Sequence, residues 1–341
     1  MSSSRVALGI SGGKDSAAAA LLLLREGLEV EAVTLRLGTP GEESRLEACE
    51  KLAATMGISL RMVDAREIFL ERIIEPFLAD YGSGITPNPC VACNARIKFD
   101  FLMDAAMATG AGWFATGHYA RLEERERRIF LAKPKETSKS QTYFLSMVNP
   151  GRMEKVRFPL ADISLETVRR LTRDLPLAQK RESQDICFLA GETLESYLRR
   201  HIPGAFRDGP LLNARGEKIG EHRGAAAVTI GQRRGLRYAA GRRLYVINRD
   251  MKRNAVILGA EKDLETIELK AGLPNYWRTV VPGEEVDVRI RYASPPTRGI
   301  IMRAGEKEIA ARFISPVRAV TPGQVAVFSR DGLVAAAGII R

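Results

Sequence analysis

The pattern of apolar and polar positions changes character part-way along the chain. Over residues 1–120, short apolar runs alternate with segments in which apolar residues recur every three or four positions. The runs predict strands, and the periodic segments, which Gly27 and Gly57 follow, predict helices. The predicted strands are 5–10, 30–35 and 59–63, and 113–118 predicts a strand that runs into a loop. The predicted helices are 17–26, 44–56 and a helix end at 103–110. This order predicts an α/β domain with a parallel sheet and helices on both faces.

Beyond about residue 200, short runs rich in Val and Ile are separated by Gly and Pro turns roughly every ten residues. Spacing of this kind predicts small β-barrels or sandwiches. The predicted strand segments are 225–238, 242–250, 254–260, 284–296, 307–316 and 323–341. We therefore expect three domains: a parallel-sheet domain at 1–204, a small β-rich domain at 205–273 and a carboxy-terminal β-barrel at 274–341.

The composition is that of a globular protein, with 45% hydrophobic and 27% charged residues among 341. Lys and Arg outnumber acidic residues by 52 to 41, which gives a net charge of +11. This balance suits a polyanionic partner such as nucleic acid, although a basic surface without a partner has the same composition. No apolar run is long enough to span a bilayer, and the start of the chain lacks a secretory signal pattern. We expect a cytoplasmic protein without a membrane partner.

The stretch "LGISGGKDS" at residues 8–16 leads from an apolar strand directly into an apolar helix. Backbone N–H groups at a helix amino terminus bind anions, and two glycines let a phosphate approach closely. Ser11 and Ser16 can add hydroxyl donors, and the Asp15 carboxylate is a ligand type that Mg²⁺ prefers. The adjacent glycines differ from the G-x-x-x-x-G-K-[ST] pattern of a Walker loop. The alternative is a glycine turn whose Ser and Asp side chains cap the helix.

Three of the four cysteines lie near basic residues. Prolines precede Cys90 and Cys93, which predicts a rigid loop before a helix. Arg96 and Lys98, with the helix amino terminus, would lower the thiol pKa values and favour thiolates. Cys187 likewise follows the basic pair Lys180 and Arg181. Cys49 lies on the apolar face of a predicted helix, where a cysteine behaves as a small core residue.

Several longer motifs occur in order along the chain. The loop "SGGKDS" resembles that of the PP-loop ATP pyrophosphatases. With "TPNPCVACNARIKF", "ATGHYAR", "KSQTYFL", "KRESQDICF", "GEHRGAAAVTIGQRRGL" and "PVRAVTPGQVAVF", the chain resembles the tRNA-specific 2-thiouridylases. This resemblance implies that ATP, with Mg²⁺, adenylates O2 of the wobble uridine, at tRNA position 34. Sulfur from a donor protein or sulfide then replaces that oxygen and gives 2-thiouridine.

The resemblance also implies residue roles. Cys93 matches the nucleophile of the family and Cys187 its partner cysteine, the two carrying a persulfide and then closing a disulfide. The implied ATP-binding residues are Ser11, Gly12, Gly13, Lys14, Asp15, Ser16, Leu35, Gly117 and His118, with Tyr119 in the same loop. The implied tRNA-binding residues are Lys139, Gln141, Tyr143, Gln232, Arg233 and Arg234. For His118, a structural role after the strand is the alternative. Arg242, Arg243, Arg289 and Arg291 are further candidates for phosphate contacts.

The chain departs from the family pattern at Cys90, where many relatives have Asp, and at Ser140, where an Asp is common. Cys90, Cys93 and Cys187 could hold a 4Fe-4S cluster that binds an exchangeable sulfide, as related PP-loop tRNA thiolases do. The alternatives are a two-cysteine persulfide route and an inert Cys90. Three further functions remain open: an amide-forming PP-loop ligase, a thiolase for another tRNA position, and a tRNA-binding module without catalysis.

Overall fold

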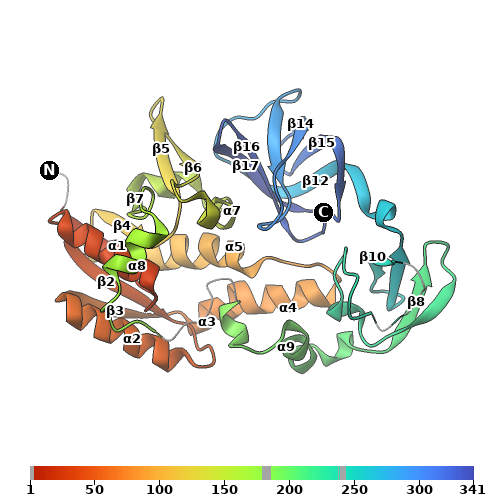
Figure 1. The fold of residues 1–341 in the computed structure, drawn as a ribbon, viewed down its shortest axis with the longest axis horizontal. Coiled ribbons are helices and arrows are strands. Elements are labelled where there is room, and N and C mark those ends of the chain that lie inside the picture. The colour runs from red at the N-terminus through yellow and green to blue at the C-terminus, as the bar shows by residue number, and fades with distance from the viewer. Residues whose placement is uncertain (1–3, 179–185, 237, 239–242) are drawn as a thin grey trace. The chain divides into compact units, whose positions relative to one another are not determined.

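The structure is a computed structural model that describes residues 4–178, 186–236, 238 and 243–341 (Figure 1). The chain divides into two compact units, which we describe separately. The first comprises Met1–Ile73, Cys90–Ala190 and Asp331–Val334, and the second comprises Ile74–Pro89, Gly191–Arg330 and Ala335–Arg341. None of the described helices combines the length and apolar character needed to cross a bilayer.

A five-stranded sheet of order β3-β2-β1-β4-β7 forms the centre of the first unit. All of its pairings are parallel, as the alternating pattern predicts. Its strands are β1 (Arg5–Gly9), β2 (Glu29–Arg36), β3 (Ser59–Asp64), β4 (Trp113–Thr116) and β7 (Val156–Arg157). Because the order reverses between β2 and β4 on either side of β1, the loops after β1 and β4 meet at one edge, where ligands of such sheets bind.

Helices α1 (Lys14–Arg25) and α2 (Glu42–Met56) follow the first two strands and pack on the sheet. Residues Ala17–Ala20 of α1 are fully buried, because small side chains let the helix approach the strands closely. Gly27 and Gly57 have φ of +75° and +65° after the two helices, which confirms the predicted helix ends. Cys49 is fully buried between α2 and the sheet, which confirms its assignment to the core.

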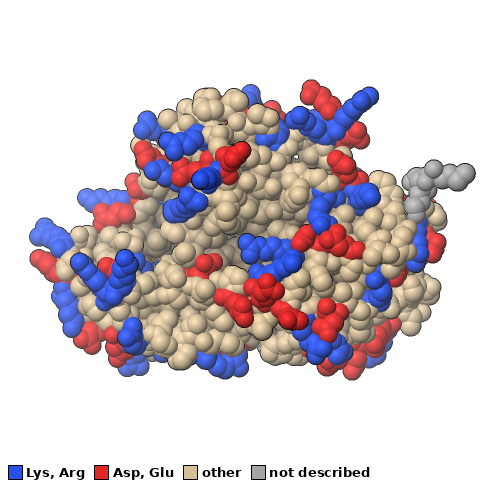
Figure 2. Space-filling model, turned by 180° about the vertical axis from the view of Figure 1, so that it is seen from behind, with Lys and Arg blue, Asp and Glu red and all other residues tan. Residues whose placement is uncertain are grey.

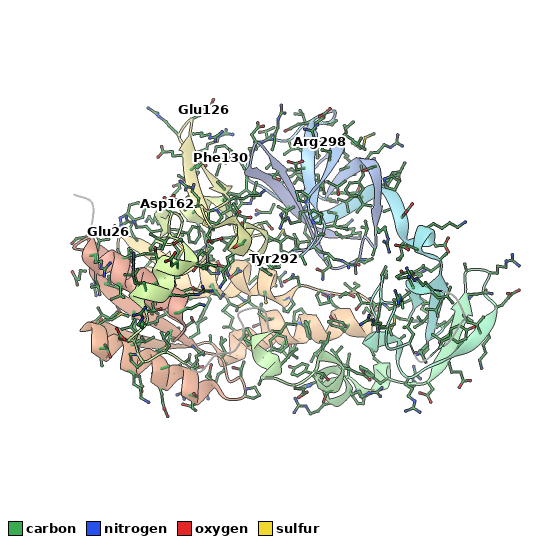
Figure 3. All side chains as sticks on the ribbon, in the orientation of Figure 1. Glu26, Glu126, Phe130, Asp162, Tyr292 and Arg298 are labelled. Atoms are coloured by element: carbon green, nitrogen blue, oxygen red, sulfur yellow. The ribbon has the colours of Figure 1, made fainter. Side chains whose placement is uncertain are left out.

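The rest of the first unit is mainly helical. A continuous helical segment consists of α5 (Pro89–Cys93), a π-helix (Asn94–Leu102) and α6 (Met103–Met107), and Phe99 from it packs edge-on against Phe114 of β4 at 5.8 Å. Strands β5 (Arg121–Arg125) and β6 (Arg128–Ala132) form a hairpin, and Glu126 lies in its turn (Figure 3). Further elements are α3 (Arg66–Phe69), a π-helical turn (Leu70–Ile74), α7 (Thr142–Leu145), α8 (Leu165–Leu171) and the 3-10 turns Thr137–Lys139, Pro150–Lys155 and Cys187–Leu189.

The second unit contains two β structures, as predicted. Four strands form a sheet of order β10-β11-β8-β9, and six form a barrel that closes through pairing of β12 with β17. The unit also contains α4 (Glu75–Gly82) and α9 (Leu194–His201). Its strands are β8 (Gly209–Asn213), β9 (Lys218–His222), β10 (Tyr245–Asp250), β11 (Ala255–Gly259), β12 (Glu265–Tyr276), β13 (Glu285–Arg289), β14 (Thr297–Ala304), β15 (Glu308–Arg318), β16 (Val325–Arg330) and β17 (Leu333–Ile340).

The predicted strand at 225–238 is wrong for the described part of that segment. Ala225–Ala227 form a 3-10 turn, and the following residues form loops up to Leu236. The Thr229 backbone N–H donates to Gln232 Oε1 at 3.0 Å, and the Gln232 N–H donates to the Thr229 carbonyl at 3.0 Å. Local turn bonds of this kind satisfy backbone groups that a strand would have paired with a neighbour.

Candidate active site

The opening loop joins β1 to α1 at the carboxyl end of the strand. The Ser11 backbone N–H donates to Ser16 Oγ at 3.1 Å, and that hydroxyl donates to the Gly13 carbonyl at 2.9 Å. Gly12 has φ +74°, and a Cβ there would lie 3.1 Å from the Arg45 carbonyl oxygen, so the position favours glycine. A Cβ on Gly13 would meet only Ser11 Oγ, at 3.5 Å.

No described side chain caps the amino terminus of α1. Its first N–H groups have no partner within the helix and, with the helix dipole, favour an anion. The capping interpretation of Ser11 and Asp15 is therefore weaker than the anion-binding one. The loop has the backbone donors, the glycine conformation and the open space in front of Gly13 that a phosphate requires.

Asp15 is held by a residue from the loop after β4. Tyr119 Oη donates to Asp15 Oδ1 at 2.9 Å, and Tyr119 is 1% exposed. Burial, followed by the Asp15 carboxylate, raises the pKa of the Tyr119 phenol, so the group stays protonated as the donor. Oδ2 of Asp15 accepts no hydrogen bond from the residues that the structure describes. A free carboxylate oxygen beside an anion cradle fits a Mg²⁺ ion that accompanies phosphates.

Gly117 and His118 occupy the same edge of the sheet. A Cβ on Gly117 would lie 2.7 Å from both the Asp15 carbonyl carbon and the Ser16 nitrogen, so the two loops are in backbone contact. His118 is 8% exposed, and its Nδ1 hydrogen-bonds to Thr116 Oγ1 at 2.8 Å. Phe99 and Phe158 lie against its ring, and burial holds its pKa well below the usual value. In this structure, the His118 ring is thus enclosed by Thr116, Phe99 and Phe158.

Leu35 lies near the end of β2 and is 7% exposed. The loop that follows it is fixed by Glu42 of α2. Glu42 Oε1 accepts from the Leu37 N–H at 2.7 Å and Oε2 from the Gly38 N–H at 2.9 Å. Arg45 donates to Glu42 at 2.9 Å and to the Leu35 carbonyl at 2.5 Å. No sequence pattern indicates this arrangement, because Glu and Arg three positions apart usually form an exposed helix pair.

Cys90 and Cys93 lie inside α5, so the prediction that they precede the helix is wrong. Pro89 is the first residue of α5. At this position the missing N–H of proline costs the helix no hydrogen bond, and its fixed φ suits the helix. The π-helix begins directly after Cys93. Such helices are rare and often occur at functional sites. Its Asn94 side chain donates to the Phe144 carbonyl at 3.1 Å.

The predicted lowering of the thiol pKa values is also wrong. Burial raises the pKa of the Cys93 thiol to about 12, and desolvation by surrounding atoms raises the pKa values of Cys90 and of Cys187, although Cys187 as a residue is exposed. The Lys98 ammonium opposes this effect at all three thiols, but desolvation of a thiolate outweighs one cation. Arg96 is exposed on the same segment.

The three thiols influence one another electrostatically, and the positive charge of Arg45 on α2 opposes the rise in the pKa of Cys187. All four cysteines of the chain are free thiols. Within the described residues, no three His, Cys, Asp or Glu side chains are grouped so that they could hold a metal ion. The 4Fe-4S ligand set is therefore not assembled in this structure.

The segment before Cys187 begins at the opening loop. The Ala178 N–H donates to the Gly12 carbonyl at 3.0 Å. The backbone of Arg45, whose side chain acts electrostatically on Cys187, also lies close to Gly12. Residues 179–185, with the basic pair Lys180 and Arg181, lie outside the described residues. Within the first unit, the backbone at Ala178 is thus hydrogen-bonded to the opening loop.

The predicted tRNA contacts of the first unit differ in their surroundings. Lys139 Nζ lies 5.7 Å from the centre of the Tyr119 ring. Gln141 exchanges hydrogen bonds with the Tyr119 backbone: its Oε1 accepts from the Tyr119 N–H and its own N–H donates to the Tyr119 carbonyl, both at 2.8 Å. Tyr143 is 2% exposed, so its side chain offers no surface to RNA in this structure.

In the second unit, the Gln232 side chain shapes the turn that carries Arg233 and Arg234. Gln232 Nε2 donates to the Arg234 carbonyl at 2.9 Å, and both arginines are exposed. Arg243 is exposed, whereas Arg242 lies outside the described residues. Arg289 and Arg291 donate to backbone carbonyls, those of Tyr292 and Ala319. On the face in Figure 2, basic side chains are interspersed with acidic ones.

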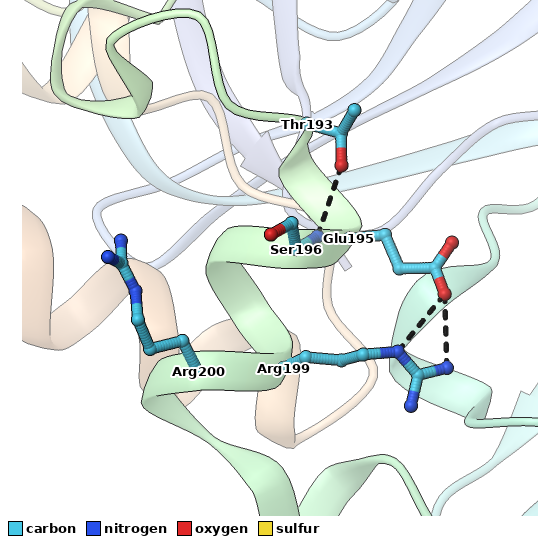
Figure 4. A pocket seen from close by; sticks show the side chains of 5 residues that line it. All are labelled: Thr193, Glu195, Ser196, Arg199 and Arg200. Carbon is cyan, nitrogen blue, oxygen red and sulfur yellow. Dashed lines mark hydrogen bonds and ion pairs between the residues drawn. The ribbon is translucent and has the colours of Figure 1, made fainter.

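A pocket on α9 is lined by Thr193, Glu195, Ser196, Arg199 and Arg200 (Figure 4). Thr193 caps the helix, and Arg199 donates to Glu195 at 3.0 Å. Arg200 pairs with Glu192 at 3.0 Å. Because both guanidinium groups already face carboxylates, the pocket carries little free positive charge, and it shares no lining residue with the predicted site.

Comparison with protein families gives matches along nearly the whole chain. Residues 4–191 match the family described as tRNA methyl transferase HUP domain. Residues 195–260 match tRNA methyl transferase PRC-barrel domain, and residues 267–340 match aminomethyltransferase beta-barrel domain. The order of a parallel-sheet domain and two β domains agrees with the observed fold.

Individual relatives are similar over their full length. The chain is 37% identical to tRNA-specific 2-thiouridylase MnmA of Pelotomaculum thermopropionicum, covering 99% of this chain and 98% of the relative. It is 38% identical to tRNA-specific 2-thiouridylase MnmA 1 of Syntrophus aciditrophicus, covering 98% and 92%. The corresponding protein of Clostridium acetobutylicum is 34% identical, covering 99% of both chains.

Proposed function

The chain belongs to the tRNA-specific 2-thiouridylases, and we propose that it replaces O2 of the wobble uridine of tRNA by sulfur. It is an ATP-dependent tRNA-thiolating enzyme of the PP-loop ATP pyrophosphatase type.

The backbone contact between Gly117 and the opening loop carries the proposal for the nucleotide site. It brings the Gly12–Gly13 cradle and Asp15 to one edge of the sheet, where the first N–H groups of α1 can bind the ATP phosphates. Bound Mg²⁺ would be held by Asp15 and would neutralise phosphate charge. Attack of the uridine O2 on the α-phosphorus forms the adenylated base and releases pyrophosphate.

For the sulfur step we propose the two-cysteine route. A donor transfers sulfane sulfur to Cys93, and the terminal sulfur of this persulfide attacks C2 of the adenylated uridine. Cys187 then attacks Sγ of Cys93: a disulfide forms, the persulfide S–S bond breaks, AMP leaves with the former O2, and sulfur stays on C2. An external thiol reduces the disulfide. The absence, among the described residues, of three metal-ligating side chains grouped around one point supports this route over the cluster.

Burial of Cys93 gives the persulfide a physical role. A thiol with a pKa of about 12 is a weak nucleophile at neutral pH. We propose that loading with sulfane sulfur supplies a more acidic terminal sulfur, so that the loaded enzyme carries a stronger nucleophile for C2 than the Cys93 thiol itself.

The test is a single-turnover assay on unmodified tRNA with ATP, Mg²⁺ and a persulfide donor. Cys93→Ala and Cys187→Ala should abolish thiolation yet retain adenylation of the tRNA. Cys90→Ala should retain thiolation. Cys49→Ala, which removes a thiol from the core, is the matched control and should also retain it, apart from lower stability.

Anaerobic purification with iron and sulfide counts accompanies the assay. Iron that disappears in Cys90→Ala together with thiolation would reject the two-cysteine route in favour of the cluster. ATP turnover in Cys93→Ala that forms an amide on an amine substrate would indicate a ligase instead. Thiolation at a uridine other than position 34 would reject the assigned position.

A further inference from the structure

Arg249 is a charged side chain enclosed within the second unit. It lies on β10 and is 8% exposed. No carboxylate pairs with it among the residues that the structure describes, and its Nε is buried without a hydrogen-bond partner there. Burial of an unpaired cation is unfavourable, so its presence needs a reason beyond stability.

The guanidinium joins two segments that are far apart in the sequence. Its Nη1 donates to the Val228 carbonyl at 2.7 Å. Its Nη2 donates to the Gly84 carbonyl at 2.5 Å and to Thr86 Oγ1 at 2.9 Å. The planar fork of arginine suits such a bridge, whereas a lysine ammonium would present one point of charge.

Thr86 is held from further directions as well. Its N–H donates to the Pro322 carbonyl at 3.0 Å, and its carbonyl accepts from Gln324 Nε2 at 2.8 Å. A Cβ on Gly323 would lie 2.9 Å from the Thr86 carbonyl carbon, so the barrel loop packs directly on this backbone. Three residues after Thr86, Pro89 starts the helix of Cys90 and Cys93. Pro87 and Pro89 stiffen this short connection.

At the other end of the bridge, Val228 leads into the turn of Gln232, Arg233 and Arg234. This turn is also fixed from the barrel, because Arg291 donates to the Ile230 carbonyl at 3.3 Å. The Gly231 N–H donates to the Val246 carbonyl at 2.8 Å and the Val246 N–H to the Gln232 carbonyl at 2.9 Å, which ties the turn to the strand of Arg249. When the turn moves, we therefore expect Arg249 to move with it, because the turn is bonded to β10 and because Val228 is bonded to the guanidinium.

We infer that Arg249 is a positioning residue that couples tRNA engagement at the Val228–Arg234 turn to the placement of the cysteine-bearing helix. The inference rests on the proposed function, in which Arg233 and Arg234 meet tRNA and Cys93 carries sulfur. The coupling makes the reactivity of the cysteines depend on whether tRNA is bound. A network of hydrogen bonds with one unsatisfied donor can adopt a second arrangement more readily than a packed apolar core.

The test measures how fast iodoacetamide modifies the peptide that contains Cys90 and Cys93, with and without unmodified tRNA. In the wild type, tRNA should change this rate by about fivefold or more, the lower end of common allosteric couplings. Arg249→Lys keeps the charge and loses the fork, and Thr86→Val removes only the hydroxyl acceptor. Both variants should still bind tRNA with a Kd close to that of the wild type, while the change in labelling rate falls to less than half.

Turnover gives a second readout. Both variants should lower kcat for thiolation while the KM for ATP stays unchanged, which a general loss of stability would not produce. Thr172→Val is the matched control: Thr172 is 3% exposed and its hydroxyl donates to the Val168 carbonyl at 2.9 Å, within α8 and its end. This control should keep the full tRNA response. Should Arg249→Lys fail to fold, Thr86→Val decides alone.

The inference is wrong if tRNA leaves the wild-type labelling rate unchanged, or if a variant saturated with tRNA keeps the full change. Thiolation by the wild type is scored in the same preparation. A wild type that responds to tRNA but does not thiolate rejects the proposed function and leaves the coupling standing.

Discussion

Gly117 lies against Asp15 so closely that a Cβ on Gly117 would be 2.7 Å from the Asp15 carbonyl carbon. Two loops from different strands, β1 and β4, are thus in backbone contact at the switch point of the sheet. Only a residue without a side chain allows this approach. The contact places Tyr119, two residues on, where its hydroxyl reaches the Asp15 carboxylate.

Gly117→Ala should push the two loops apart, because the atoms it meets are backbone and cannot rotate away. We expect a loss of about 1–3 kcal/mol in the free energy of unfolding, typical of overpacking, and weaker ATP binding. Urea unfolding and nucleotide titration measure the two effects. Gly82→Ala is the control, since a Cβ there meets nothing within 4 Å. Equal ATP affinity in wild type and Gly117→Ala would contradict the assignment of the site.

Tyr119→Phe removes the donor to Asp15 and leaves the buried ring in place. A hydrogen bond to a charged group contributes about 1.5–3 kcal/mol, so the free energy of unfolding should fall by up to that amount. The freed carboxylate loses its orientation, and the Mg²⁺ concentration needed for half-maximal adenylation should rise. Tyr81→Phe, at another buried tyrosine, should leave the Mg²⁺ dependence unchanged. A normal Mg²⁺ dependence in Tyr119→Phe would separate Asp15 from the metal.

Glu42→Gln tests the loop after β2. The carboxylate accepts from two consecutive backbone N–H groups and from Arg45, and its neutral replacement can satisfy only some of them. We expect about 1–3 kcal/mol lower stability and faster hydrogen exchange at Leu37 and Gly38. Glu43→Gln, one residue along and exposed, should change neither. Unchanged exchange at both amides would show that Glu42 does not hold the loop.

We expect the free energy of unfolding to fall in mild acid because of the buried His222. Its Nδ1 accepts from the Gly224 N–H at 3.0 Å and its Nε2 hydrogen-bonds to the Asn254 carbonyl at 2.9 Å, so the neutral tautomer with the proton on Nε2 fits both. Burial lowers its pKa. The unfolded chain therefore binds a proton near the ordinary pKa of about 6.5, before the folded chain does.

For a lowered histidine pKa, the stabilising contribution is complete above the unfolded pKa and is lost as the pH falls below it. Urea unfolding at pH 7.5 and 5.5 should show less stability at the lower pH. His222→Gln should be less stable than the wild type at pH 7.5 but lose less between the two values. His118, whose pKa is also lowered, accounts for part of the remaining loss. An identical pH dependence in His222→Gln and wild type would refute this role.

Sequence alone was sufficient where the determining interactions are local. Apolar periodicity predicted strands β1 and β2 and the helices α1 and α2 that follow them. The conformational freedom of glycine predicted the helix ends at Gly27 and Gly57 and the "SGGKDS" turn. Cys49 was assigned to the core for the same reason, because its neighbours on the helix face are apolar.

Tertiary structure decided what depends on burial and on distant partners. Basic neighbours in the sequence predicted reactive thiolates, but packing around Cys93 desolvates its thiol and raises its pKa. The segment at 225–238 has the composition of a strand, yet turn bonds through Gln232 satisfy its backbone instead. Arg249 is enclosed because Val228, Gly84 and Thr86, which accept its hydrogen bonds, meet only in the folded chain. Desolvation and long-range contact are properties of the whole fold, which no local pattern records.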